Sequence, residues 1–408
     1  MNYKISFNSK NLKGEIVLPF SKSISNRLLV IHAFTHQAFR IANLSESDDT
    51  RRMNHAFESE DNIVNIGHAG TAMRFLTAYF AAAGIEKTIT GSDRMKNRPI
   101  GELVNALNAL GAEITYTEKL GFPPLKTSGK LLKGDSISLK GSISSQYITA
   151  LLLIAPVLPN GLTINITDHL ISSSYVKLTL QMMKFFGIES TWEGNTITIA
   201  HQDYKPEDYT VEADWSGASY WYQLAMLAES VEITLHGLFS DSAQGDAAIA
   251  EMFNRTGVST CYENNKVIIS KSAEICNFFE ADFINTPDMV QTFVVALCLR
   301  GIPFRISGAQ TLRIKETDRI FALQKEMAKF GFTIREPEPG VLTWDGKKGA
   351  AMENIAIETY DDHRMALAFA PAALYYPGMV INNAEVVTKS YPQYWEQLKA
   401  FGAVLGED

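Results

Sequence analysis

The pattern of hydrophobic and polar positions repeats along the chain. Six segments begin with small or capping residues and continue as Ala-, Leu- and aromatic-rich stretches that are apolar on most faces. Helices of this kind lie inside a domain, so the pattern predicts six buried helices. Their predicted starts are Ser21, Ala69, Ser144, Asp214, Asp288 and Asp362.

Each predicted buried helix is followed by the same elements. A short β-type run comes first, such as KTITGS or FRISGA, and then an amphipathic helix, such as RPIGELVNALNALG, which often ends in Gly as a C-cap does. After four of these second helices, a further apolar run such as AEITYTE predicts another strand. The helix starts are 70 to 75 residues apart, except for a first interval of 48. We therefore expect six repeat units, with the closing hairpin of the first unit trimmed.

Six units divide naturally as three and three. The polar run KPEDYTVEAD precedes the fourth unit and is a plausible crossing between domains. The N-terminal runs KISFNS and GEIVLP can pair with the C-terminal half. The sequence thus predicts a discontinuous domain of residues 1–20 and 213–408, an inserted domain of residues 21–212, and an active site in the cleft between them.

Composition narrows the function. A chain of 408 residues with 46% hydrophobic and 20% charged residues is typical of a globular protein of two domains. The net charge of -8 argues against a nucleic-acid binder. Three cysteines without CxxC spacing indicate neither a disulfide framework nor a zinc site. The N-terminus lacks a signal-peptide core, and the longest apolar run, YITALLLIAPVL, is too short to span a bilayer. We expect a cytoplasmic protein with no membrane partner.

Cations and small polar residues concentrate at the predicted helix starts. Free N–H groups and the helix dipole make such starts anion sites, and cations placed there indicate a ligand with several negative charges, such as phosphates and carboxylates. The candidates at helix starts are Lys22, Ser23, Arg27, Gly70, Thr71, Arg74, Ser144, Ser145, Gln146, Asp288, His363 and Arg364. The connecting segments add Arg94, Lys96, Arg98, Ser172, Tyr175, Arg313, Lys315, Glu316, Arg319 and Lys389.

Other polar patterns carry less chemistry. The phosphate-loop pattern GxxxxGK[ST] and the dinucleotide pattern GxGxxG do not occur, so neither a nucleotide nor a dinucleotide cofactor is expected. His32 and His36 have metal-ligand spacing, but no carboxylate pattern accompanies them and ordinary packing is the better interpretation. The stretch DDHRM is interpreted as a helix cap with an ion-pair partner, not as a metal site.

Eight stretches, in chain order, resemble one family: LPFSKSISNR, HAGTAMRFL, RMKNRPI, SSQY, DWSGASY, RIKETDR, DDHRMA and TKSYPQY. They look like those of the 5-enolpyruvylshikimate-3-phosphate synthase family, the 3-phosphoshikimate 1-carboxyvinyltransferases. The resemblance covers nearly the whole chain and is most specific at AGTAMR and KETDR. It implies an α/β fold of two domains, each of three βαβαββ units with buried helices, in an inside-out barrel.

The resemblance also implies the reaction and the residues. The enolpyruvyl group of phosphoenolpyruvate would be transferred to the 5-hydroxyl of shikimate 3-phosphate, without metal or cofactor, by a monomeric enzyme of the shikimate pathway. Asp288 would be the base and Glu316 the proton donor, assisted by Lys22 and His363. Shikimate 3-phosphate would bind to Lys22, Ser23, Arg27, Ser144, Ser145, Gln146, Ser172, Tyr175, Asp288, Thr311 and Lys315. Phosphoenolpyruvate would bind to Lys22, Gly70, Thr71, Arg98, Gln146, Arg319, Arg364 and Lys389.

Three positions depart from the family pattern, and two alternative functions stay open. Phe20, His68 and Thr311 stand where the family usually has Gly, Asn and Asn. One alternative is an enolpyruvyl transferase acting on UDP-N-acetylglucosamine, a relative that has Asn where Ser23 stands and lacks KETDR. The other is a non-catalytic binding protein that keeps the anion pocket; the presence of both Asp288 and Glu316 weighs against it.

Overall fold

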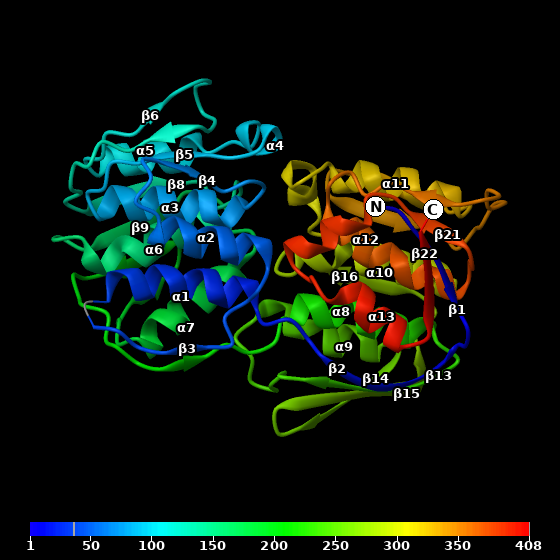
Figure 1. Ribbon diagram of the computed structural model, residues 1–408. Coiled ribbons are helices and arrows are strands. Elements are labelled where there is room, and N and C mark those ends of the chain that lie inside the picture. Colours follow the sequence, from blue (N-terminus) through cyan, green and yellow to red (C-terminus); the bar gives the residue numbers. More distant parts are fainter. Residues whose placement is uncertain (36, 408) are drawn as a thin grey trace. The chain divides into compact units, whose positions relative to one another are not determined.

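The computed structural model describes residues 1–35 and 37–407, so His36 of the predicted histidine pair lies outside the described part. The chain divides into two compact units: unit 1 is Met1–Phe20 with Glu212–Asp408, and unit 2 is Ser21–Val211. Figure 1 shows the two blue N-terminal strands in unit 1, one of them beside green strands and the other beside the red C-terminal strand. Both ends of the chain therefore belong to the same unit.

Each unit contains three buried helices that contact one another. In unit 2 these are α1 (Lys22–Phe34), α3 (Gly70–Ala82) and α6 (Ser145–Ile154), and in unit 1 they are α8 (Trp215–Leu227), α10 (Val290–Arg300) and α12 (His363–Phe369). In α8 every residue except Ser216 is buried. The six buried helices predicted from the apolar pattern are confirmed.

Most of the predicted helix starts hold. Ser21, Ser144, Asp214 and Asp362 are N-caps whose side chains accept hydrogen bonds from backbone N–H groups, as cap residues do. Ala69 is the N-cap of α3 but has no side-chain oxygen for that bond. The fifth start differs in detail, because a 3-10 turn, η3 (Pro287–Met289), precedes α10 and includes Asp288.

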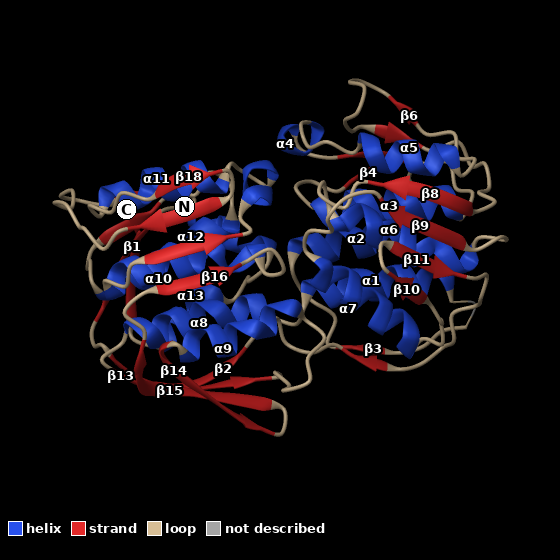
Figure 2. Ribbon diagram, turned by 180° about the vertical axis from the view of Figure 1, so that it is seen from behind, coloured by secondary structure: helices blue, strands red, loops and turns tan. Residues whose placement is uncertain are grey.

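The second helices of the repeats lie toward the outside of each unit (Figure 2). In α11, for example, Ile320 and Leu323 are buried, whereas Phe321 and Lys325 on its other side are not. This alternation is what an amphipathic helix packed on one face produces. The second helices are α2 (Asp48–Glu58), α5 (Gly101–Ala109), α7 (Ser173–Phe185), α9 (Ile249–Asn254), α11 (Arg319–Lys329) and α13 (Tyr394–Ala400).

Five four-stranded sheets share one topology: a parallel pair, then two strands added antiparallel. In unit 2 their strand orders are β4 (Ile63–Asn65), β5 (Thr88–Thr90), β7 (Leu125–Lys126), β6 (Thr115–Tyr116); and β8 (Asp135–Leu139), β9 (Leu162–Ile166), β11 (Thr196–Ile199), β10 (Thr191–Glu193). In unit 1 they are β2 (Asn11–Val17), β13 (Ser230–His236), β15 (Lys266–Ile275), β14 (Thr256–Glu263); β16 (Phe279–Asp282), β17 (Phe304–Ser307), β19 (Val341–Trp344), β18 (Arg335–Glu338); and β20 (Ala356–Ile357), β21 (Met379–Ile381), β1 (Tyr3–Phe7), β22 (Ala403–Glu407).

The sixth sheet consists of only two strands, β3 (Ile41–Ala42) and β12 (Tyr209–Thr210), which pair in parallel. Among the described residues, it has the parallel pair of the other sheets without the antiparallel hairpin. The trimmed first unit predicted from the short interval is thereby confirmed.

The N-terminal strands complete sheets built from the C-terminal half. β2 pairs in parallel with β13, from Asn11 with Ser230 to Val17 with His236. β1 lies between β21 and β22 and is antiparallel to both. The predicted pairing of KISFNS and GEIVLP with the C-terminal half is confirmed, and it explains why unit 1 is discontinuous.

Candidate active site

In unit 1, side chains from several helix starts meet around Arg319, the first residue of α11. Arg319 is 1% exposed. Its Nε donates to Asp362 Oδ2 at 2.6 Å, and its two Nη atoms donate to Asp288 Oδ1 and Glu316 Oε2, each at 2.9 Å. Burial alone would lower the pKa of Arg319, but the three carboxylates outweigh burial and raise that pKa above its usual range. Arg319 is a permanent cation that holds three carboxylates together.

Asp288 is shared between this arginine and a second one. Arg364 Nη2 donates to Asp288 Oδ2 at 2.7 Å, and Arg364 Nη1 donates to the Tyr220 hydroxyl at 3.2 Å. Lys315 Nζ lies 4.0 Å from Asp288 Oδ1. Burial would raise the pKa of Asp288, but Arg364, Lys315 and Arg319 together hold it well below its usual range. Asp288 is therefore an anion with an arginine at each carboxylate oxygen.

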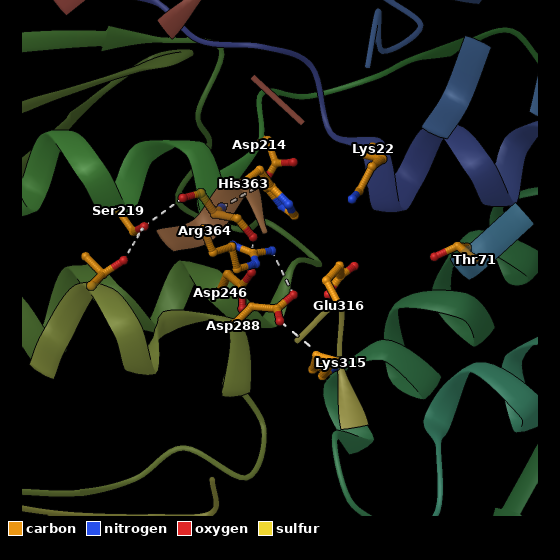
Figure 3. A network of polar contacts seen from close by, with 12 residues as sticks. Lys22, Thr71, Asp214, Ser219, Asp246, Asp288, Lys315, Glu316, His363 and Arg364 are labelled. Atoms are coloured by element: carbon orange, nitrogen blue, oxygen red, sulfur yellow. Dashed lines mark hydrogen bonds and ion pairs between the residues drawn. The ribbon is translucent and has the colours of Figure 1, made fainter. Parts of the chain in front are cut away.

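Glu316 forms the second bridge of the cluster. Its Oε2 accepts a hydrogen bond from Arg319, and its Oε1 accepts one from Lys389 Nζ. Lys389 is the last residue of the 3-10 helix η6 (Ala384–Lys389). The side chain of Glu316 is 15% exposed and that of Lys389 is 10% exposed. We call the set Asp288, Glu316, Arg319, Asp362, Arg364 and Lys389 the Arg319 cluster; part of it is drawn in Figure 3.

The backbone before α12 fixes one side of the Arg319 cluster. Tyr360 and Asp361 both have left-handed φ angles, 54° and 56°, a conformation that costs non-glycine residues about 1–3 kcal/mol each. The Tyr360 hydroxyl donates to Glu326 Oε1 at 2.7 Å, and Asn383 Nδ2 donates to Asp361 Oδ1 at 2.7 Å. These contacts hold a strained turn that aims Asp362 at Arg319.

The interpretation of DDHRM as a cap with an ion-pair partner is confirmed. Asp362 Oδ1 accepts from the Arg364 backbone N–H at 3.0 Å, and the ion-pair partner of Asp362 is Arg319. His363 Nδ1 lies 3.6 Å from Asp362 Oδ1, and His363 is 1% exposed. Within the described residues, no group of three or more His, Cys, Asp or Glu side chains could hold a metal ion.

In unit 2, Arg27 is a buried cation in a neutral environment. It lies on α1 and is 4% exposed. Its Nε donates to the Thr179 hydroxyl at 2.8 Å, and its Nη atoms donate to the carbonyls of Ser23 at 2.7 Å and Tyr175 at 3.2 Å. Burial lowers the pKa of Arg27 to about 10, against a small opposing effect of Tyr175. These contacts satisfy donors but supply no negative charge, which favours an anionic ligand.

Lys22, at the start of the same helix, has a carboxylate partner. Lys22 Nζ donates to Asp49 Oδ2 at 3.3 Å, and Asp49 lies on α2 and is 4% exposed. The sequence pattern did not single out Asp49, because its only signal was its place in the first turn of a second helix.

The starts of α3 and α6 contact each other and the loop after the short helix α4 (Asp93–Lys96). A Cβ atom built on Gly70 would lie 2.4 Å from Arg98 Nη1, so the guanidinium rests against the bare Cα of Gly70. Thr71 Oγ1 accepts from Gln146 Nε2 at 3.1 Å, and the Ser144 hydroxyl caps the Gln146 N–H at 3.3 Å. The structure thus brings Gly70, Arg98, Thr71 and Gln146 together, as the anion-site prediction requires.

Three residues of the predicted site have no described contact to its cations. Ser172 is the N-cap of α7, with a left-handed φ of 54° and no side-chain cap bond. Ser145 is buried at the first position of α6. Thr311 lies in the 3-10 helix η4 (Gln310–Ile314), and its buried hydroxyl has no hydrogen-bond partner among the described residues. None of the three makes a described contact to the cations above.

The sequence prediction also missed Tyr220 and Asp246 of unit 1. Tyr220 is buried in α8, where its hydroxyl accepts from Arg364. Burial is the main cause that raises the pKa of Tyr220 to about 12, so its hydroxyl stays protonated. Asp246 lies beside Asp288 and Arg364 (Figure 3).

Comparison with known proteins settles the family. A family model described as EPSP synthase (3-phosphoshikimate 1-carboxyvinyltransferase) matches residues 7–59 and 56–398. The chain belongs to the EPSP synthase family. It is 47% identical over 411 residues to a 3-phosphoshikimate 1-carboxyvinyltransferase of Bacteroides fragilis (strain YCH46), covering 100% of each chain. It is 35% identical to the enzyme of that name from Vibrio campbellii, covering 95% of this chain and 97% of the other.

The solved structures agree on the fold. The EPSP synthase from Acinetobacter baumannii superposes with a TM-score of 0.78 at 21% sequence identity, covering 100% of both chains. The predicted class, an inside-out α/β fold of two three-repeat domains, is confirmed. Family membership makes the chain a transferase that moves the enolpyruvyl group of phosphoenolpyruvate to shikimate 3-phosphate. In the described part of the chain, no helix combines the length and apolar character needed to cross a membrane.

Proposed function

We propose that the Arg319 cluster of unit 1 and the helix starts of unit 2 form one active site for this EPSP synthase reaction. The observation that carries the proposal is that Asp288 and Glu316, the two acids assigned from the motifs, share one buried arginine. A third acid, Asp362, anchors that arginine from the other side. The two proposed reacting acids are thus held in a fixed relation by Arg319.

Most of the residues proposed to bind shikimate 3-phosphate belong to unit 2, where Arg27 lies in a neutral environment, and three belong to unit 1. Arg27 supplies a desolvated positive charge there, and hydroxyl and amide groups supply directional hydrogen bonds. The residues proposed to bind this substrate are Lys22, Ser23, Arg27, Ser144, Ser145, Gln146, Ser172, Tyr175, Asp288, Thr311 and Lys315.

Phosphoenolpyruvate takes the arginine-rich part of the site. Its phosphate and carboxylate together carry more charge than one cation neutralises, and arginine binds both groups with a bidentate fork. Gly70 lets the Arg98 guanidinium and the start of α3 approach the same anion. The proposed residues are Lys22, Gly70, Thr71, Arg98, Gln146, Arg319, Arg364 and Lys389.

Asp288 is the proposed base. It removes the proton of the 5-hydroxyl as that oxygen attacks C2 of phosphoenolpyruvate, while the methylene carbon gains a proton to become a methyl group. The resulting tetrahedral intermediate then expels phosphate and loses a methyl proton. This elimination re-forms the carbon–carbon double bond, and the product carries the enolpyruvyl group as an enol ether. A positioned acid or base contributes about 10²–10⁴-fold to such a step.

Glu316 is the proposed proton donor to the methylene carbon, assisted by Lys22 and His363. Its contact with Lys389 places a cation beside the carboxyl that gives up the proton. The surrounding arginines stabilise the charge that develops on the departing phosphate.

The test is phosphate release from phosphoenolpyruvate, measured with shikimate 3-phosphate and, separately, with UDP-N-acetylglucosamine as acceptor. Turnover with shikimate 3-phosphate alone is expected. Turnover with the nucleotide sugar alone would support the alternative transferase. Tight binding of both substrates without turnover would support the non-catalytic alternative.

We also propose that the protein acts as a monomer in the cytoplasm. The residues assigned to both substrates all come from one chain, so no second copy is needed to complete the site. Light scattering at micromolar concentration tests the monomer, and cell fractionation tests the compartment.

A further inference from the structure

A further carboxyl group, that of Asp246, lies beside the Asp288–Arg364 pair (Figure 3). Asp246 belongs to the 3-10 helix η2 (Gly245–Ala248) and is 6% exposed. Its Oδ2 accepts from the Ser216 hydroxyl at 2.5 Å. Its Oδ1 is buried and has no hydrogen-bond partner among the residues that the structure describes. A buried carboxyl with one unused oxygen is costly to keep, so its position calls for a reason.

The loop that carries Asp246 is tied to the first turn of α8. Gln244 Oε1 accepts from the Trp215 N–H at 3.3 Å, and Gln244 Nε2 donates to the Ala213 carbonyl at 2.8 Å. Ser216, which donates to Asp246, has its own N–H bonded to Asp214 Oδ1 at 2.8 Å. The position of the Asp246 carboxyl is therefore fixed by its own bond to Ser216 and by the bonds of the preceding Gln244.

The charges around Asp246 come from several elements. Burial raises the pKa of Asp246 to about 7; Asp288 before α10 and Asp214 at the start of α8 add to the rise, whereas Ser216 and Arg364 oppose it. The only acid on the adjoining α9 is Glu251, which is exposed.

Coupling between two acids is reciprocal. Because the charge of Asp288 acts on Asp246, the charge of Asp246 acts equally on Asp288. Arg364 and Arg319 make Asp288 a weak base, since a carboxylate held by two arginines gains little from taking a proton. A second negative charge close by offsets part of that effect.

We propose that Asp246 is a positioning residue for the reaction: its carboxylate, fixed by Ser216 beside Asp288, makes Asp288 a stronger base toward the acceptor hydroxyl. The inference rests on the proposed role of Asp288. Asp246 itself touches no substrate in this account. Its effect falls on the catalytic rate and not on substrate affinity.

The pH dependence of kcat tests the proposal, using Asp246→Asn, Ser216→Ala and, as a surface control, Asp241→Asn. Asp241 is an exposed acid of the same connection. In the wild type, kcat is expected to rise through an inflection near pH 7 as Asp246 ionises. Asp246→Asn is expected to lose this inflection and to lower kcat about 10–100-fold at pH 8, with KM for both substrates within threefold. The surface control keeps the wild-type profile.

Ser216→Ala gives an independent test that retains the Asp246 carboxyl group and removes only its hydrogen-bond donor. Because the Ser216 hydroxyl favours the ionised form of Asp246, its removal is expected to move the inflection to higher pH. This variant decides the question even if Asp246→Asn does not fold. An unmoved inflection in Ser216→Ala, or a wild-type profile in Asp246→Asn, overturns the proposal.

Other outcomes would separate a failure of this inference from a failure of the proposed function. A raised KM with unchanged kcat in Asp246→Asn would make Asp246 a binding residue and contradict the proposal. Absence of wild-type turnover with phosphoenolpyruvate and shikimate 3-phosphate would overturn the proposed function together with this inference. Normal wild-type turnover with unaffected variants would overturn this inference alone.

Discussion

Arg319 in unit 1 and Arg27 in unit 2 are both buried arginines, but their charges are compensated differently. Arg319 contacts Asp288, Glu316 and Asp362, and these carboxylates raise its pKa. The described hydrogen bonds of Arg27 go to a hydroxyl and two carbonyls, and burial lowers its pKa to about 10. The protein supplies the anions for Arg319, whereas a ligand is needed to supply one for Arg27.

The different partners of Arg319 and Arg27 indicate different roles for the two arginines. An ion-paired arginine at the centre of three acids organises catalytic groups, and its removal leaves buried carboxylates uncompensated. A buried arginine without an acid raises the free energy of the ligand-free protein, and an anionic ligand recovers that free energy on binding. In the proposed mechanism, unit 1 carries the acid–base groups, and unit 2 carries an anion-binding charge for the substrate.

The largest expected effect is on the chemistry of unit 1. Asp288→Asn keeps the shape of the side chain and removes the base, so kcat is expected to fall about 10²–10⁴-fold. Steady-state phosphate release measures kcat, and calorimetric titration measures binding of both substrates, which should be retained. The exposed Asp345 offers a matched control, Asp345→Asn, with normal kcat. A near-normal rate in Asp288→Asn would remove that residue from the mechanism.

The second effect is on stability and concerns Arg319. Arg319→Met leaves Asp362 and its two neighbouring acids without their shared cation, so the free energy of unfolding is expected to fall by about 3–5 kcal/mol. Urea unfolding followed by circular dichroism measures the change. Arg335→Met, at an exposed arginine of the same unit, is the control and should change stability by less than about 0.5 kcal/mol. A loss no larger than that of the control would show that Arg319 is not the centre of the cluster.

A smaller effect is expected at the start of α3. Gly70→Ala places a methyl group where the Arg98 guanidinium now lies, and the side chain of Arg98 must move. Weakening one charged contact costs about 1–2 kcal/mol, so KM for phosphoenolpyruvate should rise roughly 10-fold while the affinity for shikimate 3-phosphate changes little. Gly217→Ala, whose new Cβ meets Pro19 at an ordinary 3.4 Å, is the control. Equal changes for both substrates would contradict this assignment.

The smallest effect is the acid dependence of stability. The pKa of Asp288 is lower in the folded protein than in the unfolded chain, where it is about 3.9. Its stabilising contribution is therefore complete above about pH 5 and is lost as pH falls below about 4. The stability difference between wild type and Asp288→Asn should shrink by about 1 kcal/mol between pH 5 and pH 3. A constant difference in urea unfolding across that range would contradict the ion-pair account.

Much of the fold was predictable because it is repeated. Local structure depends on residues close together in the chain, so it can be predicted from capping residues and the apolar runs that follow them. The capping residues are Ser21, Ser144, Asp214 and Asp362. The fifth helix start was less exact, since Pro287 allows a 3-10 turn before α10 and the capping pattern does not distinguish the two kinds of turn. Resemblance to a family added the barrel arrangement, which periodicity alone does not provide.

The sequence correctly placed Lys22, Gly70 and Arg364 at helix starts, and their assignment to the site stays a prediction. Asp49 was missed because 27 positions separate it from Lys22 within the first repeat. Asp246 was missed because Asp288 and Arg364 belong to later repeats, and no local pattern reports contacts of that range. The partner of Asp362 could not be chosen for the same reason: Arg364 is its neighbour in sequence, but the ion pair is with Arg319, 43 positions away.

The affinity of Arg27→Met for shikimate 3-phosphate, measured by calorimetric titration beside the free energy of unfolding, tests the central claim most directly. Methionine keeps the apolar stem and removes a charge that the protein does not compensate. The affinity of this variant for shikimate 3-phosphate is expected to fall about 10–100-fold, the equivalent of about 1.5–3 kcal/mol for a charged contact. Its free energy of unfolding is expected to be unchanged or higher. Unchanged affinity, or a loss of stability as large as that of Arg319→Met, would contradict the central claim.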